Sequence, residues 1–230
     1  MANANKVSDM VAENPAYARV FDRLGVDYCC HGDQTLDHAC ITAGLDPDAV
    51  IAALETADPV VDDHECANMS VTGLIEHILC AHHIYLRREL PELIQLADKV
   101  ARAHGERHPE LDRVRTLVFE IEQDLEPHML KEERVLFPAI NQLIQGHCEF
   151  PFGSIRNPIA MMGLEHERVG LLLADLRATT NDYSVPDDAC PSYRDLVERL
   201  ANLEHDTHMH VFEENQLLFP RVIEIERHAS

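Results

Sequence analysis

The sequence has few of the residues that break helices or build sheets. Its 230 residues include only 9 glycines and no tryptophan, and aromatic residues make up 5% of the chain. This composition favours helices and argues against a fold made mainly of sheets. Hydrophobic residues nevertheless make up 46%, enough for a sizeable core. The length predicts one large domain, or a large domain with a small one.

Basic residues are also scarce. Lys and Arg number 19 against 41 Asp and Glu, so the formal net charge is −22 at pH 7. Such an acidic chain disfavours nucleic acid and anionic membrane surfaces as direct partners. The sequence has no apolar run long enough to span a membrane and no apolar stretch after a basic start, so we expect a cytoplasmic protein. The 7 cysteines are scattered and odd in number, which favours reduced thiols over a disulfide framework.

The N-terminal part predicts a small helical domain. Helices are expected over residues 7–24, 35–43 and 47–57, followed by an acidic linker over residues 58–68. A compact turn of sequence Asp-Tyr-Cys-Cys-His-Gly occupies residues 27–32. A domain of this size is too small to be very stable alone, and its need for apolar cover leaves a homodimer open.

The adjacent Cys29 and Cys30 have two interpretations. They are either two small apolar residues in a turn, or a thiol pair before a helix N-terminus, where the dipole favours the thiolate. His31 would add to that effect. Ring strain disfavours a bond between adjacent cysteines, so metal binding or reaction with an outside partner is the expected use. The remaining cysteines are expected to be packing or incidental residues: Cys40, Cys66, Cys80, Cys148 and Cys190.

From about residue 69 onward the sequence predicts an all-α four-helix bundle. Segments rich in turn formers separate four long apolar-periodic stretches. The first connection is the shortest, as expected for antiparallel neighbours. The expected helices span residues 70–103, 110–144, 157–179 and 192–226.

A His-x-x-x-Glu motif occurs twice in this region. His128 and Glu132 run into Leu-Phe-Pro at residues 136–138, and His210 and Glu214 run into Leu-Phe-Pro at 218–220. Residues four apart lie on one face of a helix, so each pair can hold one metal ion or share two. One copy is weak support for a metal site, whereas two copies with the same following residues are much stronger.

Two further histidines extend the motif into a repeat. His166 follows His83 by an offset of 166 − 83 = 83 residues, and the second motif follows the first by 210 − 128 = 82 residues. All of these positions fall on apolar seams that face the bundle core. Burying carboxylates there costs several kcal/mol unless something compensates, and two metal ions bridged by the glutamates would do so. Iron, manganese and zinc all suit the predicted ligands, which are His83, His128, Glu132, His166, His210 and Glu214.

Other polar residues nearby fall off these seams. The alternative for the six is that each is a solvated or singly satisfied core residue, which matched positions in a duplicated pattern disfavour. His104, at the end of the first long helix, could line an entrance to the site. Glu133 and Glu213 are expected to be surface charges. Exposed or supporting roles are expected for His82, His205 and His208.

The motifs resemble those of the RIC (repair of iron centres) proteins, which are hemerythrin-like di-iron proteins. The resemblance covers nearly the whole chain, through the turn at 27–32 and the segments 90–93, 128–138, 165–166 and 210–221. It implies a small ScdA-type Cys-Cys domain over residues 1–60 and a hemerythrin-like bundle over residues 69–228. The bundle would hold two non-haem iron ions with an oxo-type bridge, bound by the six residues above.

The function implied by this resemblance is repair of iron–sulfur clusters damaged by oxidative or nitrosative stress. The protein would donate iron to damaged iron–sulfur proteins without enzymatic turnover, with nitric oxide or oxygen as a small ligand. Cys29 and Cys30 would receive iron or nitric oxide, or dock a client. His31 departs from the small residues also found there in relatives. The alternatives are a carrier or sensor of nitric oxide or oxygen, and a di-iron oxidase or nitric oxide reductase. The Cys-Cys domain favours repair over gas carriage.

Overall fold

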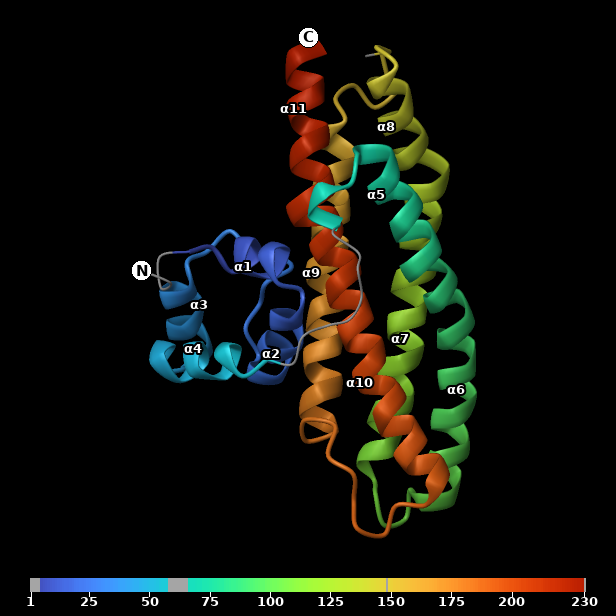
Figure 1. The fold of residues 1–230 in the computed structure, drawn as a ribbon. Helices are drawn as coiled ribbons and strands as arrows, with labels where there is room; N and C mark the ends of the chain where they lie inside the picture. Colours follow the sequence, from blue (N-terminus) through green and yellow to red (C-terminus); the bar gives the residue numbers. More distant parts are fainter. Residues whose placement is uncertain (1–4, 58–65, 148, 230) are drawn as a thin grey trace.

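The computed structural model describes residues 5–57, 66–147 and 149–229. The described chain is all-α, as predicted, and contains no β-strand beyond two isolated bridges. A four-helix bundle stands beside a small helical domain, which packs against its flank (Figure 1). In the part of the chain that is described, no helix is both long and apolar enough to cross a bilayer.

The small domain contains four helices where three were predicted. The stretch expected as one helix over 7–24 is broken at Asn14, whose backbone is extended (φ −143°, ψ 97°). Pro15 follows, and a proline disfavours the helical conformation of the residue before it. The expected linker lies outside the described residues as far as 65, and its end forms the short 3₁₀ helix η2 (Cys66–Asn68). The domain consists of α1 (Val7–Glu13), α2 (Ala16–Leu24), α3 (Leu36–Ala43) and α4 (Pro47–Glu55).

The bundle is built from four long helical rods, close to the four predicted. Three of them contain a short π-helical segment, labelled η, which the sequence did not reveal. The first rod is α5 (Val71–Ile78), η3 (Leu79–His83) and α6 (Ile84–His104). The second is α7 (Glu110–Lys131), η4 (Glu132–Leu136) and α8 (Phe137–Ile144). The third is α9 (Arg156–Thr179), and the fourth is α10 (Pro191–Phe212), η5 (Glu213–Leu218) and α11 (Phe219–Ala229).

The π-helical segments η4 and η5 occur at equivalent positions of the repeat, whereas Pro91 and Pro127 lie inside regular α-helix. The carbonyls of Glu132 and Glu214 each accept a hydrogen bond from the N–H five residues on. Pro138 and Pro220 follow directly in the two rods. Proline has no N–H and its ring crowds the carbonyl four residues before it, so a widened turn can accommodate it. No proline follows η3 at this distance, and nothing in its sequence accounts for that segment.

Two apolar clusters fill the interior, with a polar layer between them. Leu86 and Leu203 belong to one cluster, and Ile78 and Ile140 to the other. Phe21 of the small domain belongs to the same cluster as Ile78, so the small domain shares its core with one end of the bundle. The small domain thus finds its apolar cover on the bundle.

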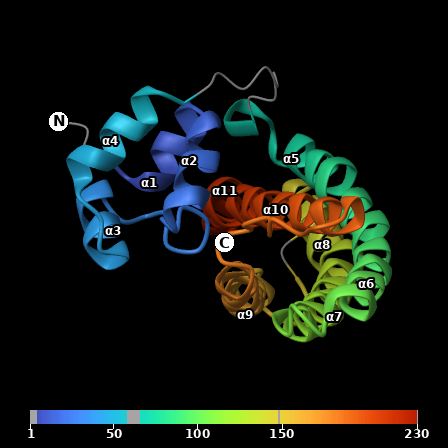
Figure 2. The ribbon, with the colours of Figure 1, turned by 90° about the horizontal axis from the view of Figure 1, so that it is seen from below.

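A buried ion-pair group also joins the two parts. Asp22 of α2 accepts hydrogen bonds from Nδ1 of His205 at 2.5 Å and Nδ1 of His208 at 2.8 Å, both on α10. These half-buried histidines therefore have a docking role. Viewed from below, α10 and α11 lie next to the small domain, while α6 and α7 lie on the far side (Figure 2).

Candidate metal centre

The six predicted ligands meet in the polar layer between the two apolar clusters. They form two groups, each with two imidazoles and the same two carboxylates. Within each group, one nitrogen or oxygen of every residue lies within 4.8 Å of the others. All six side chains are buried. The first group is His83, Glu132, His210 and Glu214, and the second is His128, Glu132, His166 and Glu214; together they are called the His–Glu cluster below.

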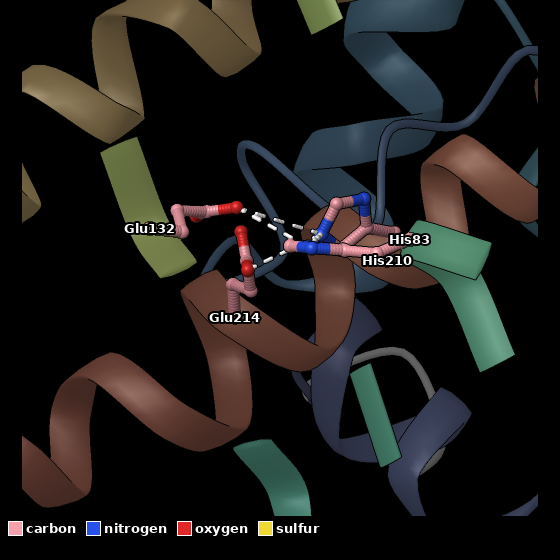
Figure 3. Close-up of side chains that lie close together, drawn as sticks. All are labelled: His83, Glu132, His210 and Glu214. Carbon is pink, nitrogen blue, oxygen red and sulfur yellow. Dashed lines mark hydrogen bonds and ion pairs between the residues drawn. The ribbon is translucent and has the colours of Figure 1, made fainter. Parts of the chain in front are cut away.

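In the first group, the carboxylates of Glu132 and Glu214 point toward two imidazoles (Figure 3). The Nε2 atoms of His83 and His210 lie 3.2 Å apart. Nε2 of His83 is 3.4 Å from Oε2 of Glu132, and Nε2 of His210 is 3.2 Å from Oε1 of Glu214. The group thus brings together donor atoms from three of the four rods.

The second group has the same form and uses the other oxygen of each carboxylate. The Nε2 atoms of His128 and His166 lie 3.1 Å apart. Nε2 of His128 is 3.4 Å from Oε1 of Glu132, and Nε2 of His166 is 3.0 Å from Oε2 of Glu214. Each carboxylate therefore directs one oxygen at each group. Each group takes one imidazole from each half of the repeat.

Three of the four imidazoles are held from behind by hydrogen bonds. Their Nδ1 atoms donate to a side-chain oxygen, which leaves the Nε2 lone pair directed into the cluster. Metal-binding histidines have this arrangement, because the second hydrogen bond fixes the tautomer and the ring orientation. The pairs are His83 with Glu133 at 2.8 Å, His128 with Glu165 at 3.0 Å and His166 with Asn215 at 3.0 Å.

His210 is the exception. Its Nδ1 meets no hydrogen-bond acceptor among the described residues, and its ring instead stacks on that of His82, with centroids 5.4 Å apart. Burial lowers the pKa of His210 well below its ordinary value. The ring is therefore neutral near pH 7, as a nitrogen ligand must be.

The residues of the His–Glu cluster fit bound metal ions. Glu132 is 0% exposed, yet within the described chain neither of its carboxylate oxygens meets a hydrogen-bond donor. Such burial costs several kcal/mol unless a cation compensates. The closest donor separations across the two groups are 3.0 to 3.4 Å. An octahedral ion with bonds of about 2.1 Å has neighbouring donors about 3.0 Å apart, close to these values.

The two parts of the chain each match a family model. Residues 74–222 match the hemerythrin HHE cation binding domain. The chain belongs to the hemerythrin family. Residues 3–58 match ScdA_N, a domain of unknown function (DUF542). The whole His–Glu cluster lies inside the matched cation-binding domain.

Curated relatives of this hemerythrin-family protein span nearly its whole length. The iron–sulfur cluster repair protein YtfE of Enterobacter sp. is 31% identical over 217 residues, 94% of this chain and 96% of the relative. The protein of the same name from Cronobacter sakazakii is 34% identical over 212 residues, 91% of each chain. That of Escherichia coli is 31% identical over 219 residues, 94% of this chain and 96% of the relative. These matches confirm the predicted resemblance to the iron-centre repair proteins.

Two glutamates expected on the surface of the hemerythrin domain are in fact next to the His–Glu cluster. Glu133 is half-buried and accepts hydrogen bonds from His83 and from Arg87, each at 2.8 Å. Glu213 is 2% exposed and faces His82, which is also buried. Both predictions were wrong: Glu213 lies three residues after His210, on the same face of the helix, and Glu133 meets His83 and Arg87 of the neighbouring rod.

His104 does not line an entrance to the cluster. It lies 21 residues beyond His83 along one rod, which places it about 30 Å away. Its Nε2 is 3.1 Å from Sγ of Cys190, and its ring packs on Tyr193 with centroids 5.5 Å apart. His104 therefore closes the far end of the bundle.

The turn that holds Cys29 and Cys30 is organised by Asp27. One oxygen of Asp27 accepts hydrogen bonds from the N–H groups of Cys29 at 3.1 Å, Cys30 at 2.9 Å and His31 at 3.3 Å. The thiols are free, with Sγ atoms 4.0 Å apart. A hydrogen bond with Cys30 and burial raise the pKa of Cys29 well above its ordinary value. Of the two interpretations, a helix-stabilised thiolate is not supported at Cys29, since α3 begins only at Leu36 and His31 pairs with Asp27.

Close packing fixes this turn against the rest of the protein. A Cβ atom on Gly32 would lie 2.2 Å from the carbonyl oxygen of Tyr28, so only glycine fits there. The carbonyl of Cys29 accepts hydrogen bonds from the side-chain amides of Asn215 at 3.3 Å and Gln216 at 2.9 Å. Asn215 also holds His166, so a single side chain joins the Cys-Cys turn to the His–Glu cluster.

The remaining cysteines do not share one role. Cys40 is buried in the small-domain core, as predicted. Cys148 lies outside the described residues. Cys80 is exposed, and Cys190 contacts His104. Cys66 is the least expected, because its Sγ lies 3.4 Å from the buried carboxylate of Glu213.

Proposed function

We propose that the protein binds two non-haem iron ions in the His–Glu cluster and donates iron to damaged iron–sulfur clusters. The orientation of Glu132 and Glu214 carries this proposal, because each directs one oxygen at each imidazole pair. That orientation supports one ion in each group, bridged by both carboxylates and by an oxo group. The printed names of the curated relatives support the repair role.

The donor set supports an iron centre that can give up its metal. Each group offers two imidazoles and one oxygen from each of two carboxylates, which leaves coordination positions for water, oxygen or nitric oxide. Carboxylates are harder ligands than the thiolates of an iron–sulfur cluster, so ferrous iron gains by moving to a thiolate-rich client. Bound iron would supply the exchangeable metal and an open coordination position. The protein contributes fixed imidazole orientations and the exclusion of water.

The Cys-Cys turn supports a role in delivery. Cys29 is joined through Asn215 to the imidazole of His166. Cys30 is half-buried, and is thus the more accessible of the two thiols. We propose that this pair receives iron or nitric oxide, or docks the damaged client, with Cys30 as the outer thiol.

The setting of this activity follows from the thiols and the charge. The scattered cysteines, 7 in number, support a reducing compartment, the cytoplasm. The clients would be iron–sulfur proteins damaged by oxidative or nitrosative stress. Nitric oxide and oxygen would be small ligands of the metal, and the net charge of −22 supports a role without nucleic acid or membrane partners.

The test follows the iron itself. The protein is loaded with ⁵⁷Fe and analysed by metal assay and Mössbauer spectroscopy, with two antiferromagnetically coupled irons per chain expected. It is then incubated with an enzyme whose [4Fe–4S] cluster has been damaged by nitric oxide. We expect the enzyme to regain activity and its repaired cluster to contain ⁵⁷Fe.

The control is a Glu132→Ala variant, which should carry no iron and repair nothing. Reversible binding of gas with all iron retained would instead identify a carrier or sensor. Sustained turnover of nitric oxide with an electron donor would identify a reductase. Repair without transfer of ⁵⁷Fe would overturn donation, and zinc in iron-supplemented cells would overturn the iron centre.

A further inference from the structure

A second group of possible metal ligands lies behind the His–Glu cluster. Cys66 of η2, His77 of α5 and Glu213 of η5 each place one donor atom within 4.8 Å of the others. Oε1 of Glu213 is the centre of the group, 3.4 Å from Sγ of Cys66 and 3.3 Å from Nε2 of His77. Nε2 of His82 also approaches this oxygen, at 3.5 Å. None of these residues belongs to the His–Glu cluster.

The carboxylate of Glu213 is buried without full compensation. Glu213 is 2% exposed, and within the described chain its Oε2 meets no hydrogen-bond donor. A buried carboxylate next to a thiol and an imidazole is stabilised when a cation binds all three. The competing account is that a protonated His82 neutralises Glu213 and no metal is needed.

The spacing of the three donors suits a tetrahedral transition-metal ion. With bonds of about 2.0 to 2.3 Å to oxygen, nitrogen and sulfur, neighbouring donors lie about 3.3 to 3.5 Å apart. The two separations from Glu213, 3.3 and 3.4 Å, agree with this value. A thiolate with an imidazole and a carboxylate favours Fe²⁺ or Zn²⁺ over Mg²⁺ or Ca²⁺. Three protein ligands leave a fourth position open, as in sites that exchange ligands.

The segment that carries Cys66 is anchored to the bundle. The guanidinium of Arg221 on α11 donates hydrogen bonds to the carbonyl of Ala67 at 2.5 Å and to that of Met69 at 2.7 Å. These bonds hold η2 over η5, so the thiol of Cys66 is positioned against Glu213.

This group lies between the His–Glu cluster and a cavity. Glu213 directly precedes Glu214 in the chain, and the ring of His82 stacks on that of His210. On its other side the group lines a cavity of about 1240 Å³ between the bundle and helices α1 and α2. An ion that leaves the cluster past His210 would meet these three donors before it reaches the cavity.

We propose that Cys66, His77 and Glu213 form a mononuclear metal site that receives ferrous iron on its way out of the His–Glu cluster. The assignment of iron rests on the proposed donation function. The ion stays ferrous throughout and only its ligands change. The thiol of Cys66 gives up its proton to bulk water as the Fe–S bond forms, and takes one back when the ion leaves.

The site is tested with Co²⁺, which reports thiolate ligation by its charge-transfer absorption in the near ultraviolet. The full chain, with its His–Glu cluster already filled with iron and with Cys29→Ser and Cys30→Ser removing the other thiol pair, is titrated with Co²⁺ without oxygen. We expect one Co²⁺ per chain to bind with a thiolate band. Cys66→Ser should abolish the band, whereas Cys80→Ser should retain it, because Cys80 lines the same cavity but lies outside the group.

Two results would overturn the site. One is the absence of a thiolate band in the chain that retains Cys66, which would favour a protonated His82 as the partner of Glu213. The other is a band that survives Cys66→Ser and disappears in Cys80→Ser. X-ray absorption at the cobalt edge, which counts sulfur neighbours, gives a second measurement if a variant folds poorly.

The transfer role has its own readout. Ferrous iron released from the reduced, iron-loaded chain is captured by a chromogenic chelator. We expect Cys66→Ser to slow this release by about ten-fold or more while its iron content stays equal to that of Cys80→Ser. Equal release rates would overturn the transfer role. Failure of the unaltered chain to repair a damaged cluster would overturn donation alone, because the cobalt result does not depend on repair.

Discussion

His128 with Glu132, and His210 with Glu214, present the same donor atoms to the His–Glu cluster from opposite halves of the repeat. The residue five positions after each motif histidine also has the same role. Glu133 follows the first motif and holds His83, while Asn215 follows the second and holds His166. Their offset, 215 − 133 = 82, is that of the ligands. The repeat therefore extends to the residues that orient the ligands.

The outer pair of each half shows where the repeat diverges. Next to the first motif, Lys131 pairs with Glu165 of the third rod, which holds His128; next to the second motif, the equivalent positions are Glu213 and His82 of the first rod. The offsets are 213 − 131 = 82 and 165 − 82 = 83. The charges are reversed, and the side chain of Lys131 is 49% exposed while that of Glu213 is 2% exposed.

The two outer pairs therefore differ in burial. Next to the first motif, the ion pair between Lys131 and Glu165 faces solvent, and Glu165 supports His128 by a hydrogen bond. The second half buries its acidic member against Cys66 and His77, under the small domain. The His–Glu cluster thus has one flank next to a solvent-exposed ion pair and another flank next to the cavity.

The largest expected effect comes from the bridging carboxylates, where the two halves should behave alike. Glu132→Ala and Glu214→Ala each remove a donor from both groups, so we expect the iron content to fall nearly to zero. His128→Ala touches one group and should retain about one iron per chain. Metal analysis after desalting gives the content.

Glu76→Ala is the matched control, since Glu76 is an exposed carboxylate on α5. A Glu132→Ala chain that still holds two irons contradicts the bridging role. Unequal iron contents of the Glu132→Ala and Glu214→Ala chains would break the equivalence of the two halves.

A smaller effect is expected from Glu165→Ala, which acts on the first half only. It leaves Nδ1 of His128 without its acceptor, and loss of such a partner costs about 10- to 100-fold in metal affinity. Competition with a chelator measures the change. Glu167→Ala, an exposed neighbour on α9, should leave the affinity unchanged. An unaltered affinity in Glu165→Ala would mean that the hydrogen bond at Nδ1 does not orient His128.

Much of the His–Glu cluster could be predicted, because its residues recur in the sequence at a constant spacing. His83, His166 and the two motifs share one offset, and helical periodicity places them on inward seams. The same offset would also have identified Glu133, Glu165 and Asn215 as supporting residues. On a regular helix, however, these three positions point away from the core.

The rest could not be predicted from local patterns. The π-helical segments have no local signal, since Pro138 and Pro220 follow two of them while Pro91 and Pro127 lie inside regular α-helix. Cys66 meets Glu213 across 147 residues of chain, by a route that no periodicity encodes. The break at Asn14 is different, because Pro15 signals it directly even though the apolar pattern continues on both sides.

Asp22 joins the small domain to α10 of the second half, and this is the contact to break. Hydrogen bonds and charge from His205 and His208 outweigh burial and hold its pKa at about 2, below the ordinary 3.8. A lowered carboxylate pKa stabilises the fold above about pH 4, and that stability is lost as the pH falls toward 2. Asp22→Asn should therefore cost about 2 kcal/mol at pH 6.

Urea unfolding of the metal-free chains, followed by circular dichroism, measures this cost. The difference between the Asp22→Asn chain and the unaltered chain should shrink between about pH 4 and pH 3. Asp33→Asn, at an exposed carboxylate in the same domain, is the control and should show little difference at any pH. A cost that is the same at pH 6 and pH 3 would show that charge on Asp22 does not hold the domain.

The smallest effect is expected at Lys131, the exposed member of the first outer pair. An ion pair with a half-exposed lysine contributes about 0 to 1 kcal/mol, and Glu165 keeps its hydrogen bond to His128 without it. Lys131→Met should therefore change iron affinity by less than about three-fold. This change should disappear at high salt. Chelator competition at low and high ionic strength measures this. A loss of iron affinity as large as that of Glu165→Ala would mean that the Lys131–Glu165 ion pair also orients His128. The two outer pairs would then differ less in function than they do in exposure.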